Sequence, residues 1–105
     1  MQEISLNFRE AKWREMPGYP AGTKVKPLRE DGKHKTYLIK LPDGFKGEPH
    51  VFSMNEQHFV LEGSYSDEGV VYGPGAYRSI PAGNAHDGTS SEKGAIILVI
   101  QEPIT

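Results

Sequence analysis

Histidine and carboxylate side chains are the groups of this sequence whose types and spacing could support metal binding or proton transfer. Cysteine is absent, so any metal ligand must be an imidazole or a carboxylate. His34 lies in the charged segment 30–35, which is typical of a solvated turn. The remaining histidines are the candidates for chemistry, and they are His50, His58 and His86.

Glu56 and His58 stand two residues apart at the start of an otherwise apolar segment. Residues two apart on a β-strand point to the same face, so Glu56, His58 and Val60 are expected to share one face. An ionised carboxylate is costly to bury unless it is paired or bound to a cation. A divalent cation is one such partner. The alternative is that the imidazoles are satisfied by hydrogen bonds in an apolar pocket.

His86 follows a bend formed by residues 81–84, and closure of a barrel could bring it across from His50. Two imidazoles and one carboxylate with open coordination positions are the ligand set of non-haem iron oxygenases, and the same set can hold zinc, nickel or manganese. The residues therefore predict one divalent metal ion (Fe, Zn, Ni or Mn), without deciding which.

Short strands separated by turns are the elements that must position these side chains. Twelve glycines and eight prolines divide the chain into segments that are β-branched, aromatic or alternating. We predict an all-β fold, a sandwich or closed barrel, because such architectures protect their strand edges. The predicted strands cover residues 4–8, 36–41, 58–66, 70–72, 76–80 and 95–100, the last expected to be buried on both faces.

Length and charge restrict the class of protein. With 105 residues and no break in composition, we expect a single domain over residues 1–105. The net charge is −2 and the signs are interspersed, which indicates no nucleic-acid partner. The longest apolar run, 95–100, is too short to cross a bilayer, and the first residues lack a signal-peptide stretch. We expect no membrane partner and a cytoplasmic location.

Two segments have the residue spacing of the cupin superfamily. Segment 44–63 reads Gly44, five residues, His50, one residue, Phe52, three residues, Glu56, six residues, Gly63, and it resembles the first cupin motif, G-x5-H-x-H-x3,4-E-x6-G. Segment 75–90 reads Gly75, five residues, Pro81-Ala82-Gly83, two residues, His86, three residues, Ser90, and it resembles the second, G-x5-P-x-G-x2-H-x3-N.

The segments 59–68 and 75–81 are further similar to the ChrR-type cupins, a group that is compared with acetylacetone-cleaving dioxygenases. The resemblance implies a double-stranded β-helix, or jelly-roll, cupin barrel. It also implies metal ligands at His50, Glu56 and His86.

Phe52 departs from the pattern, because it occupies the family's second histidine position and a phenyl ring cannot bind the metal. His58 is the obvious substitute, although it lies roughly 6.6 Å further along the strand than Glu56, at ~3.3 Å per residue. It is therefore either a ligand or a histidine that lines the pocket. A site that binds no metal is a third interpretation. Ser90 replaces an asparagine that is not a metal ligand.

Phe52, Tyr77 and Arg78 are predicted to line the substrate pocket. Arg78 could bind an anionic substrate if it shares a face with Ile80, and otherwise it is exposed. The aromatic residues could equally belong to an ordinary core. No catalytic residue is assigned.

The cupin resemblance implies a metal-dependent enzyme acting on a small organic molecule, most simply a dioxygenase that cleaves a carbon–carbon bond in a diketone-like compound. The alternative is a non-catalytic module that recognises a small molecule or a metal. Isomerase and epimerase chemistry also occurs on cupins, so the fold does not decide the reaction. The resemblance to small cupins also implies a homodimer.

Overall fold

The computed structural model describes residues 3–103, and it confirms the all-β prediction. Its strands are β1 (Arg14–Glu15), β2 (Lys24–Asp31), β3 (His34–Leu41), β4 (Phe45–Lys46), β5 (His50–Val51), β6 (Asn55–Gly63), β7 (Tyr65–Asp67), β8 (Val70–Tyr72), β9 (Tyr77–Ile80), β10 (Ala85–His86), β11 (Ser90–Ser91) and β12 (Ala95–Glu102). Within residues 3–103, no helix is long and apolar enough to span a membrane.

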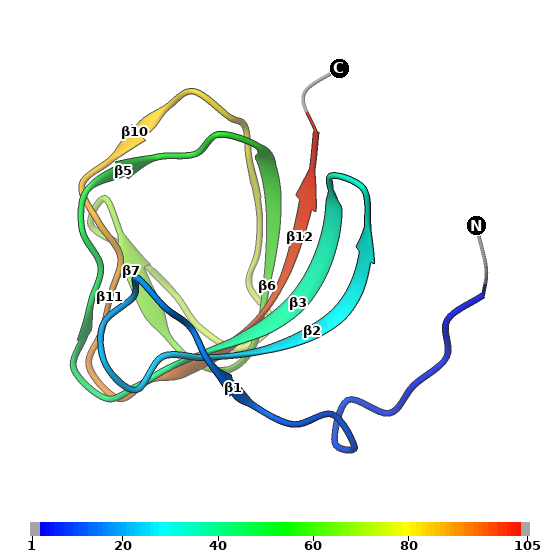
Figure 1. Cartoon of the computed structure of the whole chain (residues 1–105). Coiled ribbons are helices and arrows are strands. Elements are labelled where there is room, and N and C mark those ends of the chain that lie inside the picture. Colours follow the sequence, from blue (N-terminus) through cyan, green and yellow to red (C-terminus); the bar gives the residue numbers. More distant parts are fainter. Residues whose placement is uncertain (1–2, 104–105) are drawn as a thin grey trace.

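The strands form three antiparallel sheets that curve around a common interior (Figure 1). The largest has the order β1-β2-β3-β12-β6-β9, a second has the order β4-β11-β7-β8, and β10 pairs with β5. β12 is central, because it pairs with β3 on one side and with β6 on the other. The chain therefore closes the barrel with elements that are far apart in sequence.

One end of the barrel interior is apolar. Ala95 and Ile97 of β12 are buried, and they lie in register with Leu41 and Ile39 of β3. Val60 of β6 lies opposite Ile97 and is 1% exposed. Residues two positions apart in one strand project to the same side, and so do register partners on adjacent strands. These side chains therefore pack together.

The other end of the same face is polar. Val99 lies in register with Tyr37 and His58, and Gln101 lies in register with Glu56. The period of two along β6 thus places Glu56, His58 and the buried core on one face, as the sequence predicts. The chemical groups of β6 consequently project into the barrel.

β12 is buried on its inner face only. Its outward residues Ile96, Leu98 and Ile100 are partly exposed, so the expected burial on both faces is wrong. The reason is that no second layer of described residues fully covers this part of the sheet. A continuous apolar run alone does not separate these two cases.

Two tight backbone positions shape the strand ends near the site. Gly63 has φ of +70°, and a side chain there would overlap the carbonyl oxygen of Gly94, so β6 needs glycine where it leaves β12. Glu68 and Gly69 have φ of 53° and 79° and form the turn between β7 and β8. This turn fixes the end of β7, where Asp67 lies.

The N-terminal part differs from the prediction. Ile4, Leu6 and Phe8 alternate as a strand would, but residues 3–13 form no strand and these three side chains are exposed. An alternating segment needs a neighbouring strand for its backbone hydrogen bonds, and the described part of the chain provides none. Figure 1 shows this segment extending beside the barrel.

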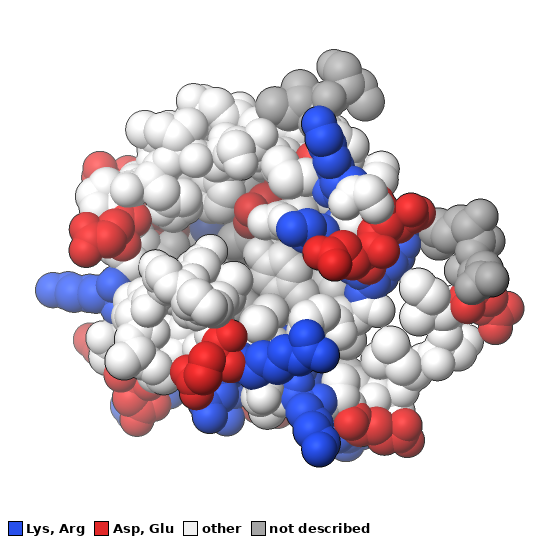
Figure 2. All heavy atoms as spheres, viewed as in Figure 1, with Lys and Arg blue, Asp and Glu red and all other residues white. Residues whose placement is uncertain are grey.

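β2 was not predicted, because Pro27 and charged residues obscure its alternation. The register with β3 shifts between Pro27 and Arg29, and a proline is tolerated at such an irregularity. Lys26 is buried at 6% exposure, and its amine donates to the carbonyl oxygen of Phe8 and lies 4.6 Å from the Trp13 ring. Figure 2 shows acidic and basic side chains interspersed on the face viewed, in line with the small net charge.

Candidate functional site

β5 and β10 form a short pair that places two histidines directly opposite each other. His50 and His86 are register partners, and their ring centroids are 6.0 Å apart with an angle of 23° between the planes. Closure of the barrel therefore brings together two imidazoles that are 36 positions apart in the chain (86 minus 50).

Both of these imidazoles have an oxygen acceptor at Nδ1. His50 Nδ1 lies 3.1 Å from the carbonyl oxygen of Glu48, and His86 Nδ1 lies 2.8 Å from Oδ2 of Asp67. We assign the hydrogen to Nδ1 in each ring, which leaves the lone pair on Nε2. His86 Nε2 is buried, with no hydrogen-bond partner among the described residues. An oxygen acceptor behind the ring is what metal-binding histidines normally have.

Phe52 makes edge contacts with three imidazoles. Its ring centroid lies 4.5 Å from that of His50, 4.9 Å from that of His86 and 6.2 Å from that of His58. A phenyl ring provides apolar surface there and no electron pair for a metal ion. Phe52 therefore packs against all three imidazoles but adds no lone pair with which a metal ion could be bound among them.

Glu56 and His58 bind each other rather than the histidine pair. His58 Nε2 donates to Oε1 of Glu56 at 2.8 Å, and Gln101 donates to Oε2 at 2.9 Å. His58 Nδ1 lies 2.9 Å from the Tyr65 hydroxyl. Both nitrogens of His58 are therefore engaged in hydrogen bonds, and neither can bind a metal ion in this arrangement.

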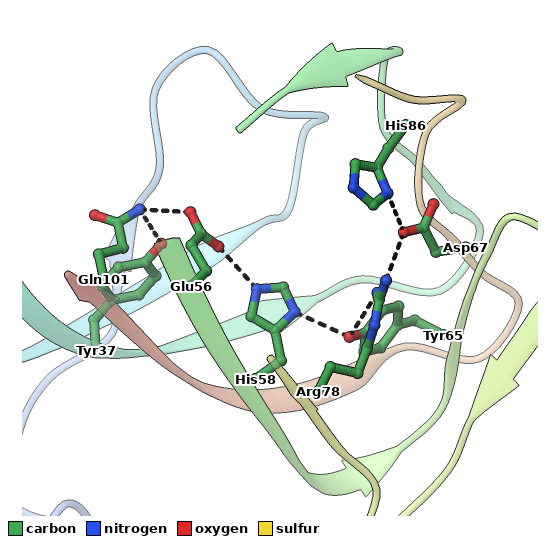
Figure 3. Close-up of polar contacts among 8 residues, drawn as sticks. All are labelled: Tyr37, Glu56, His58, Tyr65, Asp67, Arg78, His86 and Gln101. Carbon is green, nitrogen blue, oxygen red and sulfur yellow. Dashed lines mark hydrogen bonds and ion pairs between the residues drawn. The ribbon is translucent and has the colours of Figure 1, made fainter. Parts of the chain in front are cut away.

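The hydrogen bonds continue from His58 to His86 (Figure 3). Arg78 Nη1 donates to the Tyr65 hydroxyl at 3.3 Å, and Arg78 Nη2 donates to Oδ2 of Asp67 at 3.0 Å. The same Asp67 oxygen accepts from His86. Seven side chains from five strands, β6, β7, β9, β10 and β12, are thus linked, from Gln101 at one end to His86 at the other.

Arg78 and Tyr77 occupy opposite faces of β9. Arg78 faces inward with Ile80, and its side chain is 13% exposed, so the exposed alternative for Arg78 is wrong. Its guanidinium is paired with Asp67, which leaves it poorly placed to bind an anionic substrate. Tyr77 is 56% exposed and donates to Gln57 on the outer surface. Its predicted place in the pocket is therefore corrected, because strand alternation turns it outward.

The acidic and histidine side chains gather differently from the predicted ligand set. Among residues 3–103, one group has all its ligand atoms within 4.8 Å of one another, and it consists of Asp67, Glu68 and His86. Asp67 Oδ1 is buried without a hydrogen-bond partner. The Arg78 guanidinium on the same carboxylate opposes a second cation there. Asp67 thus fits better as the outer contact of His86 than as a metal ligand.

A cavity of about 460 Å³ opens beside these residues. Its apolar wall comes from the barrel core and includes Ile39, Leu41, Phe45, Ile97 and Val99. Its polar wall includes Tyr37, His50, Glu56, His58, Tyr65 and Gln101. A cavity of this size with an apolar body and a few polar groups suits a small organic molecule.

Tyrosine hydroxyls near the carboxylate stay protonated. Burial, and then the Glu56 charge, raise the pKa of Tyr37 well above its ordinary value, and the same two causes raise the pKa of Tyr19. The Tyr37 hydroxyl accepts a hydrogen bond from Gln101 at 3.2 Å. Its own proton can therefore be donated to a molecule in the cavity.

Sequence reasoning missed the residues that surround the histidines. Asp67 lies just beyond the strand predicted at 58–66, although its alternation with Tyr65 on β7 is a signal that both face inward. Both are buried, at 2% and 3% exposure. Gln101 carries no distinguishing signal, because it follows an apolar run that ends at Ile100.

Comparison with known proteins gives a family and a fold. The family model described as a ChrR cupin-like domain matches residues 1–105. No curated protein matches the chain.

Several solved structures are similar to this chain. An RmlC-like cupin from Ralstonia eutropha JMP134 has a TM-score of 0.86 and 18% identity, covering 98% of this chain and 70% of that chain. The acetylacetone dioxygenase from Acinetobacter johnsonii has a TM-score of 0.79 and 13% identity, covering 96% and 73%. A chain in the complex of Rhodobacter sphaeroides SigE with the anti-sigma ChrR has a TM-score of 0.73 and 22% identity, covering 91% and 52%. At these identities the likeness shows the fold, and it confirms the jelly-roll prediction.

Proposed function

The chain belongs to the family of ChrR cupin-like domains, and on that premise we propose that it is a metal-dependent cupin that acts on a small organic molecule. The similarity to the acetylacetone dioxygenase fold supports chemistry of the dioxygenase type. The proposed metal ligands are His50 and His86, with Glu56 as the carboxylate of the set.

The paired imidazoles carry this proposal. His50 and His86 face each other across β5 and β10, and each has Nδ1 directed at an oxygen. The buried Nε2 of His86 has no partner among residues 3–103, and an unpaired buried nitrogen is unfavourable unless something binds it. A divalent ion with a preference for imidazole fits this nitrogen.

Glu56 is the carboxylate that remains for the ion. It currently accepts from His58 and Gln101, and a carboxylate has further lone pairs available beyond these two bonds. His58 is left out of the proposed ligand set, because both of its nitrogens are in hydrogen bonds. Its metal-binding role stays a prediction that the geometry does not favour.

The cavity residues would bind and orient the organic molecule. The apolar wall, with Ile39, Val99 and Phe52, would bury its hydrocarbon part and exclude water. The protonated Tyr37 hydroxyl would donate to a carbonyl oxygen. A metal ion bound at the histidines would supply Lewis-acid activation of an oxygen-bearing substrate.

Metal content tests the ligand assignment. We would measure it by elemental mass spectrometry on tag-free protein, after reconstitution with iron, zinc, nickel or manganese. Wild type is expected to hold close to one ion, and His50→Ala and His86→Ala are each expected to lose it. His34→Ala is the matched control, because His34 is an exposed histidine on β3. An absence of bound metal in wild type after reconstitution would contradict the proposal.

Oxygen uptake separates an enzyme from a binding module. Iron-loaded protein prepared without oxygen would be given a panel of diketones, and uptake that is lost in His86→Ala would support the dioxygenase proposal. Metal binding with no uptake for any compound favours the second candidate, a non-catalytic sensing cupin. The existing bonds of Glu56 to His58 and Gln101 are the observation that favours this second candidate.

A further inference from the structure

Among residues 3–103, Arg78 is the residue whose hydrogen bonds join the two branches of the network, one through Asp67 to His86 and the other through Tyr65 to His58. Its guanidinium lies 3.0 Å from Asp67 Oδ2 and 3.3 Å from the Tyr65 hydroxyl, and it stacks 4.2 Å from the Tyr72 ring centroid. Arginine has donors and no acceptor, so the direction of both bonds is fixed. Asp67 and the Tyr65 oxygen therefore both accept from Arg78, and the direction of the remaining bonds follows from the groups further along each branch.

The branch through Asp67 determines the tautomer of His86. Asp67 is a buried carboxylate, 2% exposed at its side chain, and it only accepts when ionised and paired with a guanidinium. The hydrogen of His86 must therefore lie on Nδ1, which is 2.8 Å from Asp67 Oδ2. Nε2 of His86 is left with a free lone pair.

The branch through Tyr65 has the opposite effect on His58. Glu56, at the far end of this branch, only accepts when ionised, so His58 Nε2 donates to it and His58 Nδ1 accepts the proton of the Tyr65 hydroxyl, 2.9 Å away, whose oxygen accepts from Arg78. Burial raises the pKa of Tyr65, although Arg78 lowers it, and the hydroxyl remains a donor. The hydrogen of His58 must then lie on Nε2, where it is donated to Glu56.

The geometry points to Arg78 as a positioning residue that, together with the Glu56 carboxylate, holds His86 and His58 in opposite tautomers, so that His86 alone of the two presents a free ring nitrogen. This role deepens the proposed function, and it rests on that function only in taking His86 as a metal ligand. It also explains why an arginine lies on the inner face of a barrel without lining the cavity: both edges of its guanidinium are already in use.

Nitrogen NMR on the wild-type protein tests this assignment directly. Protein with ¹⁵N-labelled histidine would be stripped of metal with EDTA, and long-range ¹⁵N–¹H spectra would report which nitrogen carries the hydrogen. We expect Nδ1–H for His86 and Nε2–H for His58, with each ring assigned by its His→Gln variant. Finding the same tautomer in both rings, or Nε2–H in His86, would overturn the inference.

Three variants are expected to give three different patterns. Asp67→Asn should change only the His86 signals, because the amide can donate to Nδ1 and move the hydrogen to Nε2. Tyr65→Phe should change only those of His58. Arg78→Met should change both, and unchanged tautomers in a folded Arg78→Met protein would overturn the role of Arg78. If Arg78→Met does not fold, the wild-type spectrum and the His58 signals of Tyr65→Phe still test the tautomer assignment.

Arg78→Lys is the conservative variant. A merely structural role of Arg78 would predict the same histidine tautomers in this variant as in wild type. A single ammonium group can pair with Asp67 but lacks the fork that reaches two acceptors at once. We therefore expect the His86 tautomer to be retained and that of His58 to be lost or mixed. Retention of both tautomers in Arg78→Lys would contradict the requirement for a guanidinium.

Zinc affinity tests whether the hydrogen bonds from Arg78 through Asp67 to His86 support the proposed metal site. Asp67→Asn is expected to weaken Zn²⁺ binding by about 10- to 100-fold, as loss of an outer contact of a ligating histidine does. Tyr77→Phe is the control, because Tyr77 lies on the outer surface. Wild type that binds no zinc but shows the expected tautomers would contradict the proposed function and leave the role of Arg78 intact. Equal zinc affinity in wild type and Asp67→Asn would contradict the link between them.

Discussion

The His50–His86 pair and the Glu56–His58 pair are built from the same kinds of residue but differ in what their atoms can still bind. In the first pair each Nδ1 has an oxygen acceptor, and Nε2 of His86 is buried and unpaired. In the second pair both nitrogens of His58 already have partners, whereas each oxygen of Glu56 accepts one bond and keeps a further lone pair. The capacity of a histidine to bind a metal is therefore decided by its neighbours.

These neighbours come from strands outside the sequence motif. Asp67 and Tyr65 lie on β7, Arg78 on β9 and Gln101 on β12. Phe52 contacts histidines of both pairs, and its phenyl ring occupies the space between them without offering a lone pair to a metal ion. Each of the following changes alters one side of this comparison.

The largest expected effect is on stability, from removing the carboxylate behind His86. Asp67→Ala would leave the buried Arg78 charge and the His86 Nδ1–H without a partner, so we expect a loss of about 3–5 kcal/mol in the free energy of unfolding. Urea denaturation at neutral pH measures it. Glu15→Ala is the control, because the Lys24–Glu15 pair is exposed (44% and 73%) and should contribute at most about 1 kcal/mol. Equal losses in the two variants would contradict the buried role of Asp67.

Phe52→His should place an imidazole that can bind a metal ion between the His50–His86 pair and the Glu56–His58 pair. It restores an imidazole at the position where the cupin motif has its second histidine, so we expect at least about tenfold tighter Zn²⁺ binding. Titration against a competing chelator measures the affinity. Phe52→Leu, which also removes the aromatic ring but adds no donor, is the control. If both variants bind zinc equally, Phe52 does not occupy a ligand position.

Tyr65→Phe acts on the His58 side alone. It preserves the ring packing but leaves His58 Nδ1 and one Arg78 donor without their partner, at a cost of about 1–3 kcal/mol. Thermal or urea unfolding measures this cost. Tyr77→Phe removes a hydroxyl that bonds Gln57 on the surface and should stay within about 0.5 kcal/mol of wild type. A neutral Tyr65→Phe would show that His58 needs no such donor.

The smallest effect concerns the partly buried Tyr37 hydroxyl, whose pKa is raised by burial and then by the Glu56 charge, and it is seen at alkaline pH. The raised pKa of Tyr37 means that an unfolded tyrosine, with a pKa near about 10, loses its proton first. The contribution to stability is full below that pH and is lost as pH rises above it, at up to about 1.4 kcal/mol per pH unit. Urea denaturation between about pH 9 and pH 11 should show a shallower decline for Tyr37→Phe than for wild type. Parallel declines would mean that Tyr37 is not shielded from water beside Glu56 as the structure places it.

Parts of the fold could be predicted from the sequence because local patterns encode them. The strands near 36–41, 70–72, 76–80 and 95–100 follow from alternation and from Gly or Pro at the turns. β2 was missed because its charged residues and Pro27 mask the period of two. The strand expected at residues 4–8 fails for the opposite reason, since its alternation is present but it lacks a partner strand.

The site was predicted in its residue types and only partly in its arrangement. The motif spacing correctly places His50 and His86 close together, because β5 and β10 pair in register. It does not reveal that Glu56 is bonded to His58, or that Arg78 faces inward to Asp67. Asp67 bonds Arg78 and His86, which are 11 and 19 positions away, and 45 positions separate Gln101 from Glu56, so these contacts depend on the pairing of strands that are distant in the chain.

The sequence by itself determined the family, the all-β class and the positions of the imidazoles, because fixed spacings between turns and side chains are local properties of the chain. Only the tertiary structure decided which imidazole nitrogen is free. Hydrogen-bond direction passes from the Arg78 guanidinium through Asp67 and Tyr65, and it exists only when β6, β7, β9 and β10 are brought together. A lone pair on a histidine is therefore a property of the closed barrel.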